Sequence, residues 1–466
     1  MIVHKFIPNS NESSTNEMLR GLGLKEIDDL FSDVPENVRL QRPLRIPVAL
    51  SEIELEKYVS EKLGRNMTPP DYLNFLGGGV RLHHVPSVID EILSRGEFYT
   101  AYTPYQPEIS QGMLQGMFEY QSLICELTSM DVANSSMYDW ATALGEAGRM
   151  ASRATKRKRM LVPGNISPER RKILETYCYP GGIELEEVGY TSRGLVDIGS
   201  LESKLDEDVA GIYLENPNFF GIIEESAEDI ASIAHAKGAL LIVGVDPLTL
   251  GVLKPPGRYG ADIVVGDGQT MGLYPNFGGP LIGILATRND PNLLRQMPGR
   301  LIGMTNEKSN PTRRGFAMVL QTREQHIRRE QATSNICTNE ALFAIAVSIY
   351  LSSMGPQGIK EIGEQMITKA HFAERRLVEE GIETPFFHGS FFGELSVKTK
   401  TRSLELAKRL LGFKILGGLP MERFFAESSG LSSVSLFSFT ELHSEKDIEL
   451  LVNSLSLIER KAGVSI

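Results

Sequence analysis

The carboxylate of Asp246 stands where an α/β enzyme would place a functional group. It directly follows the apolar run at residues 240–245, which predicts a buried strand. In open α/β sheets, ligands bind beyond the carboxyl ends of the strands. A carboxylate there could pair with the ring nitrogen of pyridoxal phosphate and keep that ring an electron sink. It could equally cap a turn together with Pro247, and the residues alone favour neither interpretation.

A helix start at residues 139–145 could hold an anion. The run reads Asp-Trp-Ala-Thr-Ala-Leu-Gly, and small residues around Thr142 would let a phosphate approach the free N–H groups of the first turn. The alternative is an ordinary N-cap by Asp139, followed by an alanine-rich helix packed in the core. From these residues alone, capping is the favoured interpretation.

A glycine-rich run at residues 266–272 follows another apolar segment, residues 261–265. Its spacing does not fit the dinucleotide fingerprint, and the prolines and glycines of residues 275–280 prevent the helix that must follow. An Asp-ended strand, a further strand and a Gly-rich loop are instead the layout of an aminotransferase-type pyridoxal phosphate enzyme. That layout requires a Schiff-base lysine just after the second strand. No lysine occurs between Lys254 and Lys308, so the scaffold is present and the nucleophile is missing.

The elements that must position these residues alternate between helix and strand. Apolar strands separated by helices predict a mainly parallel sheet covered on both faces. We expect an N-terminal helical segment over residues 1–65, a large α/β domain over 66–335 and a small α+β domain over 336–466. The expected strands cover residues 160–162, 183–188, 212–214, 239–245, 262–265, 394–397 and 434–439. The expected helices begin at residues 52, 114, 139, 168, 227, 338, 360, 403 and 444.

Composition excludes several function classes. The chain has 466 residues and a net charge of −11, which argues against a nucleic-acid partner. The basic cluster at residues 156–159 fits a helix C-terminus better than a nucleic-acid site. Three separated cysteines and scattered histidines indicate no metal site. The apolar stretch at residues 341–351 is too short for a membrane span, and with no signal peptide we expect a cytoplasmic protein.

Two long strings in the chain carry a resemblance to a known family. Residues 102–112 read Tyr-Thr-Pro-Tyr-Gln-Pro-Glu-Ile-Ser-Gln-Gly, and residues 321–330 read Gln-Thr-Arg-Glu-Gln-His-Ile-Arg-Arg-Glu, continuing into Ala-Thr-Ser-Asn-Ile-Cys-Thr-Asn at 332–339. Both strings resemble signatures of the glycine cleavage system P-protein, and the resemblance covers essentially the whole chain. In some members of this family the P-protein is split into two chains. This chain resembles subunit 1, which corresponds to the N-terminal half.

This resemblance implies a pyridoxal-phosphate fold type I scaffold and a decarboxylase subunit. The complex would decarboxylate glycine and pass the aminomethyl group to the lipoyl arm of the H-protein. In the family's catalytic half, a His-Lys-Thr run carries the cofactor, whereas this chain has Gln269-Thr270-Met271 at that place. The resemblance therefore places the cofactor on a second subunit, in a heterotetramer of two copies of each. Thr142 and Asp246 would be remnants of a degenerate cofactor pocket.

The same resemblance suggests which residues reach the partner's site across the subunit interface. These candidates are Tyr102, Tyr105, Gln106, Glu108 and Gln111. The alternative is a rigid, proline-rich turn whose tyrosines are hydrogen-bonded internally. The arginines of residues 313–329 could bind a carboxylate, but most such arginines form surface or interface pairs. Two other functions stay open: a self-sufficient pyridoxal phosphate enzyme of the aminotransferase or desulfurase kind, and a purely structural subunit.

Overall fold

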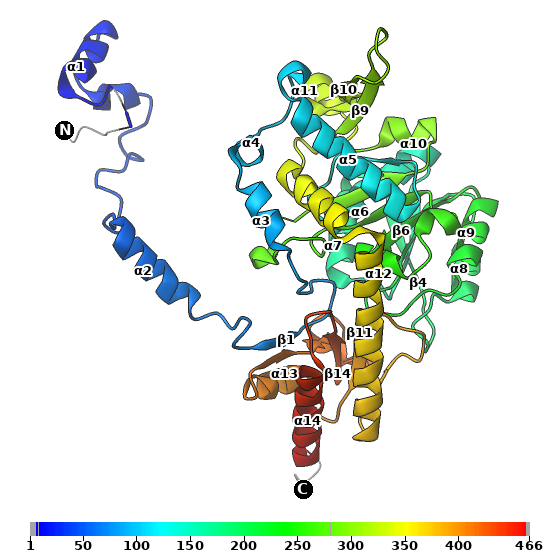
Figure 1. Cartoon of the computed structure of the whole chain (residues 1–466). Helices are drawn as coiled ribbons and strands as arrows, with labels where there is room; N and C mark the ends of the chain where they lie inside the picture. The colour runs from blue at the N-terminus through cyan, green and yellow to red at the C-terminus, as the bar shows by residue number, and fades with distance from the viewer. Residues whose placement is uncertain (1–5, 8, 280, 463–466) are drawn as a thin grey trace. The chain divides into compact units, whose positions relative to one another are not determined.

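A seven-stranded sheet forms the centre of the part of the chain that follows Asn66 (Figure 1). The computed structural model describes residues 6, 7, 9–279 and 281–462. The strand order is β2-β8-β7-β6-β5-β3-β4, and β7, β6, β5, β3 and β4 pair in parallel while β8 and β2 join antiparallel. The strands are β2 (Val132–Ala133), β3 (Arg159–Pro163), β4 (Glu184–Val188), β5 (Val209–Glu215), β6 (Leu240–Val245), β7 (Ile263–Asp267) and β8 (Gly283–Thr287). The predicted mainly parallel sheet is confirmed.

Both faces of this sheet are buried, as its apolar strands predict. Successive residues of β6 point to opposite sides, with Leu241 and Val243 in one core cluster and Ile242 in the other. The first cluster includes side chains of α5 (Gln111–Thr128), α9 (Ala227–Ala236) and α12 (Ala341–Glu379). The second includes side chains of α6 (Trp140–Thr155) and α7 (Pro168–Cys178). The helix starts predicted at residues 139 and 168 are confirmed by the caps, Asp139 and Ser167.

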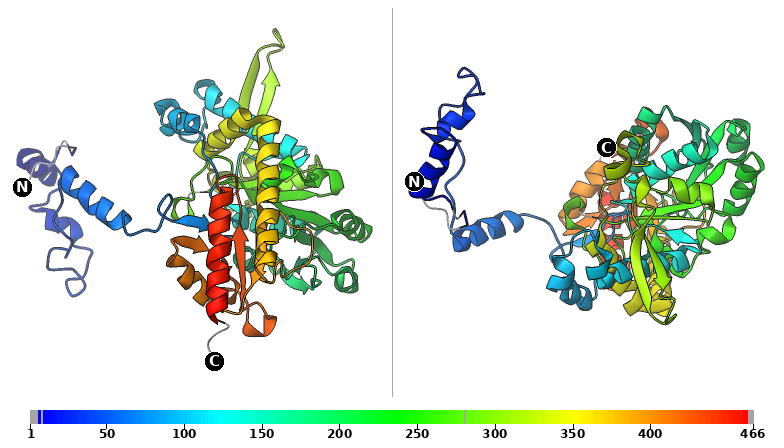
Figure 2. Two further views of the ribbon diagram at one scale, coloured as in Figure 1. Left: turned by 60° about the horizontal axis from the view of Figure 1, so that its bottom comes forward. Right: turned by 90° about the horizontal axis from the view of Figure 1, so that it is seen from above.

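The C-terminal part forms a smaller α+β layer with its own apolar core. Its sheet has the order β11-β14-β13, formed by β11 (Glu394–Lys398), β14 (Val434–Ser438) and β13 (Leu419–Pro420). Helices α13 (Ser403–Leu411) and α14 (Glu445–Ala462) pack with it, and α14 lies beside α12 (Figure 2). A segment distant in sequence joins this layer, because β1 (Leu73–Phe75) pairs in parallel with β12 (Ile415–Gly417).

Helix α12 combines the two helices predicted over residues 338–354 and 360–380. The backbone leaves helical geometry at Gly355, which has a φ of 59°, and Pro356 follows. The predicted break is therefore real, and the two halves of α12 run in different directions on either side of it (Figure 1). By length and hydropathy alone α12 could cross a membrane. Its residues Ala344, Val347 and Met366 are instead fully buried in the core.

An antiparallel hairpin that the sequence did not predict projects from the large domain (Figures 1 and 2). Its strands are β9 (Leu301–Asn306) and β10 (Arg314–Val319). This part of the chain also contains the short helices α3 (Ser87–Leu93), α4 (Gly96–Tyr99), α8 (Ile198–Lys204), α10 (Pro291–Gln296) and α11 (Gln325–Arg328). Met1–Asn66 form a separate unit with α1 (Glu12–Gly21) and α2 (Glu52–Leu63). The helix start predicted at residue 52 is confirmed by a capping box between Ser51 and Glu54.

Candidate functional site

Asp246 directly follows strand β6 and faces Arg81, with which it forms a buried ion pair. Both residues are only 7% exposed. Oδ1 of Asp246 also accepts a hydrogen bond from the Leu248 N–H at 3.1 Å, so the carboxylate caps the following turn. The Thr270 hydroxyl donates to the same oxygen at 3.4 Å. The structure thus brings together Asp246 and Thr270, and it adds a cation that the sequence interpretation did not include.

The same guanidinium also approaches a carboxylate of the small layer. Nη1 of Arg81 lies 3.4 Å from Glu394, the first residue of β11. Glu394 accepts hydrogen bonds from the N–H groups of Gly78 at 3.0 Å and Gly79 at 3.2 Å. Burial raises the pKa of Glu394, while Arg81 and these two donors act in the opposite direction. Arg81 therefore links the large domain to the small layer.

A second buried pair lies next to the first. Arg170 on α7 donates to both carboxylate oxygens of Glu215, at 2.7 and 2.9 Å. Its guanidinium lies 3.9 Å from the ring centroid of Trp140, a cation–π contact. The indole N–H of Trp140 donates to the Tyr213 hydroxyl at 3.1 Å, which in turn donates to Glu215 at 3.1 Å. Burial raises the pKa of Tyr213 well above its usual range, so the phenol stays protonated.

The helix start that was considered as a possible phosphate cradle is occupied by the chain's own carboxylates. Oδ1 of Asp139 accepts from the Thr142 N–H at 2.8 Å, and the Thr142 hydroxyl accepts from the Asp139 N–H at 3.2 Å. Oδ2 of Asp267 accepts from the Trp140 N–H at 3.4 Å. Burial raises the pKa of Asp267 to about 7, although N–H groups of Gln269 and Trp140 lower it in part. The capping interpretation of Asp139 is confirmed.

These residues do not fit a pyridoxal phosphate cofactor. The cavity beside Asp246 measures about 20 Å³, about the space of one water molecule and far below the roughly 300 Å³ of a small ligand pocket. The carboxylate that should face the ring nitrogen is paired with Arg81. The helix donors that should face the phosphate are bonded to Asp139 and Asp267. Thr270, which lies after β7 and hydrogen-bonds Asp246, has no amine.

The residues predicted to reach the partner's site, between Tyr102 and Gln111, include both exposed and inward-turned side chains. Tyr102 is 77% exposed and Tyr105 is 45% exposed, and both line an open hollow of about 650 Å³. Gln106 and Glu108 are exposed as well. Gln111 is turned inward, because its amide donates to the Phe316 carbonyl at 2.9 Å and accepts from the Phe316 N–H at 2.9 Å.

Buried Arg300 supports this stretch from below. Its guanidinium donates to the Tyr105 hydroxyl at 2.8 Å and to the Thr103 hydroxyl at 2.9 Å. Glu324 lies 3.8 Å away, and the ring of His326 contacts Tyr105 edge-on at 5.9 Å between centroids. Tyr105 is therefore hydrogen-bonded internally, as one interpretation of the sequence had it, whereas the side chain of Tyr102 points to solvent.

Several arginines that could have bound ligands are committed to the fold. Arg323 donates to the carbonyls of Leu320, Met297 and Gly299. In the basic cluster, Arg157 donates to two main-chain carbonyls, Lys158 donates to a third, and Arg159 pairs with Asp206 at 2.5 Å. The cluster follows the C-terminus of α6, as predicted, but these side chains bond to groups outside that helix.

The sequence interpretation missed Arg81, Glu394, Arg170 and Glu215. A usable signal existed for Glu215, because it ends the buried strand β5 and a carboxylate there needs a partner. Arg81 follows the run Gly77-Gly78-Gly79-Val80 and carries no comparable signal. Its partners lie far along the chain, and only the fold brings them together.

Comparison with known proteins gives the family. The model for "Glycine cleavage system P-protein" matches residues 4–455. A "Probable glycine dehydrogenase (decarboxylating) subunit 1" of Staphylothermus marinus is 47% identical over 464 residues, covering 97% of this chain and 98% of that protein. The chain belongs to the glycine cleavage system P-protein family. A P-protein relative of the same name in Carboxydothermus hydrogenoformans is 48% identical, over 97% of this chain and 99% of its own length.

Solved structures agree with this P-protein assignment. A crystal structure titled glycine decarboxylase (P-protein) of the glycine cleavage system, in inhibitor-bound form, has a TM-score of 0.87 and 39% identity over 98% of this chain and 100% of that chain. A NifS-like protein has a TM-score of 0.60 at 15% identity, over 83% of this chain and 99% of that chain. An alanine–glyoxylate aminotransferase from Nostoc sp. has a TM-score of 0.57 at 14% identity, over 85% of this chain and 98% of that chain. The last two show the fold alone, and they confirm the predicted fold type I architecture.

Proposed function

We propose that this chain is subunit 1 of a two-chain glycine decarboxylase of the glycine cleavage system. The observation that carries the proposal is the match, along nearly the full length of both proteins, to relatives that bear this name. The assembled enzyme decarboxylates glycine and passes the aminomethyl group to the lipoyl group of the H-protein. Pyridoxal phosphate supplies the electron sink for the decarboxylation.

The cofactor is bound by subunit 2 in this proposal. Two features of the chain support that assignment: Thr270 stands in place of the lysine, and the ion pair of Asp246 with Arg81 fills the pocket. The chain's own contribution is then to complete the partner's site. A two-chain enzyme built on this plan would be a heterotetramer of two copies of each subunit, and we expect it in the cytoplasm.

The stretch from Tyr102 to Glu108 is the part of the chain proposed to contact the partner's site. The exposure of Tyr102 and the open hollow beside it support this role. A phenol and polar side chains held on a rigid, proline-containing turn could orient a substrate carboxylate and amine. Arg300 fixes the position of Tyr105 from beneath. Gln111 supports the stretch by holding the neighbouring hairpin.

Co-expression tests this proposal against its alternatives. The chain is purified alone, and together with the second P-protein subunit of the same organism, and glycine–bicarbonate exchange is measured for both. We expect exchange only from the complex, since neither chain alone holds all parts of the site. Exchange by the chain alone at the rate of the complex would contradict the proposal and favour a self-sufficient enzyme. Exchange by subunit 2 alone at the full rate would favour a purely structural role for this chain.

A further inference from the structure

Arg81 sits at a junction between two cavities and two layers of the protein. Asp246 belongs to the large sheet and Glu394 to the small one, and both carboxylates approach the same guanidinium. Arg81 and Glu394 are 7% and 3% exposed, so these charges interact in a medium that screens them poorly. The Nε of Arg81 has no hydrogen-bond partner among the residues that the structure describes. The two ion pairs therefore account for how this buried cation is tolerated.

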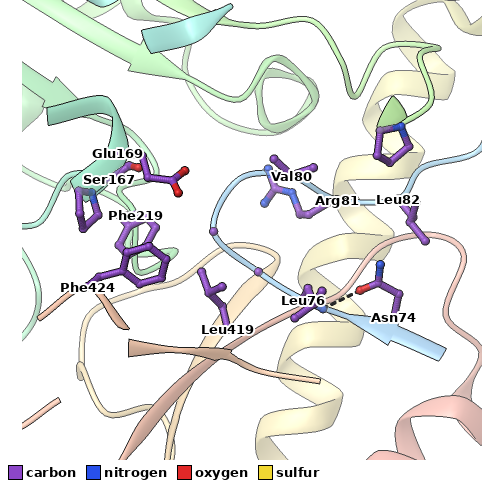
Figure 3. Close-up of a pocket in the computed structure, with 14 residues that line it drawn as sticks. Asn74, Leu76, Val80, Arg81, Leu82, Ser167, Glu169, Phe219, Leu419 and Phe424 are labelled. Carbon is purple, nitrogen blue, oxygen red and sulfur yellow. Dashed lines mark hydrogen bonds between the residues drawn. The ribbon is translucent and has the colours of Figure 1, made fainter. Parts of the chain in front are cut away.

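The cavities on the two sides of Arg81 differ strongly in size. The outer one measures about 270 Å³ and is lined by Leu76, Glu169, Leu419 and Phe424 among others (Figure 3). The inner one, beside Asp246, measures only about 20 Å³. Both are lined by Gly78, Arg81 and Phe219. Arg81 is thus part of the wall that separates the outer cavity from the remnant of the cofactor site.

The charged groups around Arg81 oppose binding of a pyridine ring and of a phosphate beside Asp246. A pyridine ring can approach Asp246 only if its nitrogen replaces the guanidinium, because Asp246 is already paired. If Arg81 were displaced, the buried carboxylate of Glu394 would lose its cationic partner. The desolvation of that carboxylate would then be uncompensated, which is costly. Asp139 and Asp267 occupy the helix donors, so an incoming phosphate would also meet two carboxylates.

We propose that Arg81 blocks cofactor binding on this chain independently of the missing amine: its side chain takes the place of the cofactor ring as the partner of Asp246 and clamps the small layer onto the large domain. This proposal concerns the isolated chain, so it can fail whether or not the two-chain function is correct. The clamp also positions the segment from Gly78 to Arg81, whose first two N–H groups bind Glu394.

Cofactor uptake by lysine-restored variants tests the exclusion. Thr270→Lys is compared with Thr270→Lys/Arg81→Ser, and Thr270→Lys/Arg193→Ser serves as the matched control because Arg193 forms a half-exposed surface pair. The assay is done at pH 6, where Asp267 is mainly protonated. Pyridoxal phosphate retained after gel filtration is measured by absorbance, and borohydride-trapped peptides are mapped by mass. We expect at least about tenfold tighter retention in the Arg81→Ser double variant than in the other two. Equal retention in all three variants would overturn the proposal.

Hydrogen exchange of the full, unmutated chain tests the clamp without relying on a variant that might fold poorly. The N–H groups of Gly78 and Gly79 should exchange as slowly as those of the core strand β6, because they are bonded to buried Glu394. Arg81→Ser should speed their exchange on the order of a hundredfold, and Arg193→Ser should leave it unchanged. Exchange of the Gly78 and Gly79 N–H groups at the rate of an open loop in the unmutated chain would overturn the clamp.

Discussion

Gln111 hydrogen-bonds the main chain of Phe316 in both directions, with two distances of 2.9 Å. The side-chain amide of Gln111 binds this main chain as a neighbouring strand would. It thereby provides hydrogen-bond partners for the N–H and C=O groups of Phe316 in β10. Gln121, ten residues further along α5, does the same for Ile302 on the other strand, at 3.0 and 2.9 Å. Helix α5 thus holds both strands of the β9–β10 hairpin through two glutamines.

Replacing Gln111 should loosen the hairpin. Gln111→Met keeps the length of the side chain but leaves the N–H and C=O of Phe316 without partners, which should lower the free energy of unfolding by about 1–3 kcal/mol. Urea unfolding gives that value, and hydrogen exchange of β10 gives the local effect. Gln115→Met, at an exposed position of the same helix, is the control and should change little. Equal stability of the two variants would show that the Gln111 bonds contribute nothing.

Tyr102 and Tyr105 should respond differently to loss of the hydroxyl. Tyr105→Phe removes an acceptor from buried Arg300, so the free subunit should lose about 1–3 kcal/mol of unfolding free energy. Tyr102→Phe should leave that stability unchanged, since the side chain is exposed. In the assembled enzyme, however, Tyr102→Phe should lower glycine–bicarbonate exchange by about tenfold or more if the phenol contacts the reacting groups. Unchanged exchange in Tyr102→Phe would favour a purely structural subunit.

Asp267 should make stability depend on pH in the acidic to neutral range. Its pKa in the folded chain is about 7, above the ordinary value of 3.8, so the folded state holds the proton more tightly than the unfolded state. Stability should therefore fall as the pH rises from about 4 to 7, with a slope of up to about 1.4 kcal/mol per pH unit. Asp267→Asn keeps the acceptor oxygen and should flatten this part of the curve. Parallel curves for the unmutated chain and Asp267→Asn would contradict the assignment, and exposed Asp208→Asn is the control.

Two glycine substitutions should change stability in opposite directions. A Cβ at Gly244 would overlap the Tyr213 hydroxyl and lie 2.8 Å from the Trp140 ring, so Gly244→Ala should cost about 1–3 kcal/mol and disturb the network around Arg170. A Cβ at Gly112 in α5 meets no atom within 4 Å, so Gly112→Ala should gain about 0.5–1 kcal/mol. Thermal unfolding of the free subunit measures both. A stabilised Gly244→Ala variant would show that the network tolerates displacement.

The architecture was predictable because its signals are local. The strand at residues 240–245 is apolar throughout, and Ser167-Pro168 marks a helix start, so both elements follow from short windows of sequence. The break at Gly355 was predictable for the same reason. The β9–β10 hairpin was not predicted, since its strands are held by Gln111 and Gln121 of a distant helix.

The candidate site was predictable only in part. Asp246 and Thr270 were found from their places after two strands, and they do meet. The partner of Asp246 could not be found this way, because Arg81 lies 165 positions earlier and reaches it only through tertiary packing. The same applies to Glu394, whose carboxylate contacts Gly78 across more than 300 positions.

The location of the cofactor tests the whole account most directly. The two-chain enzyme, assembled with pyridoxal phosphate and active in glycine–bicarbonate exchange, is reduced with borohydride, and the modified lysine is identified by peptide mass. We expect one modified lysine per pair of subunits, always on subunit 2, and none on this chain. A pyridoxyl-modified lysine on this chain would contradict it.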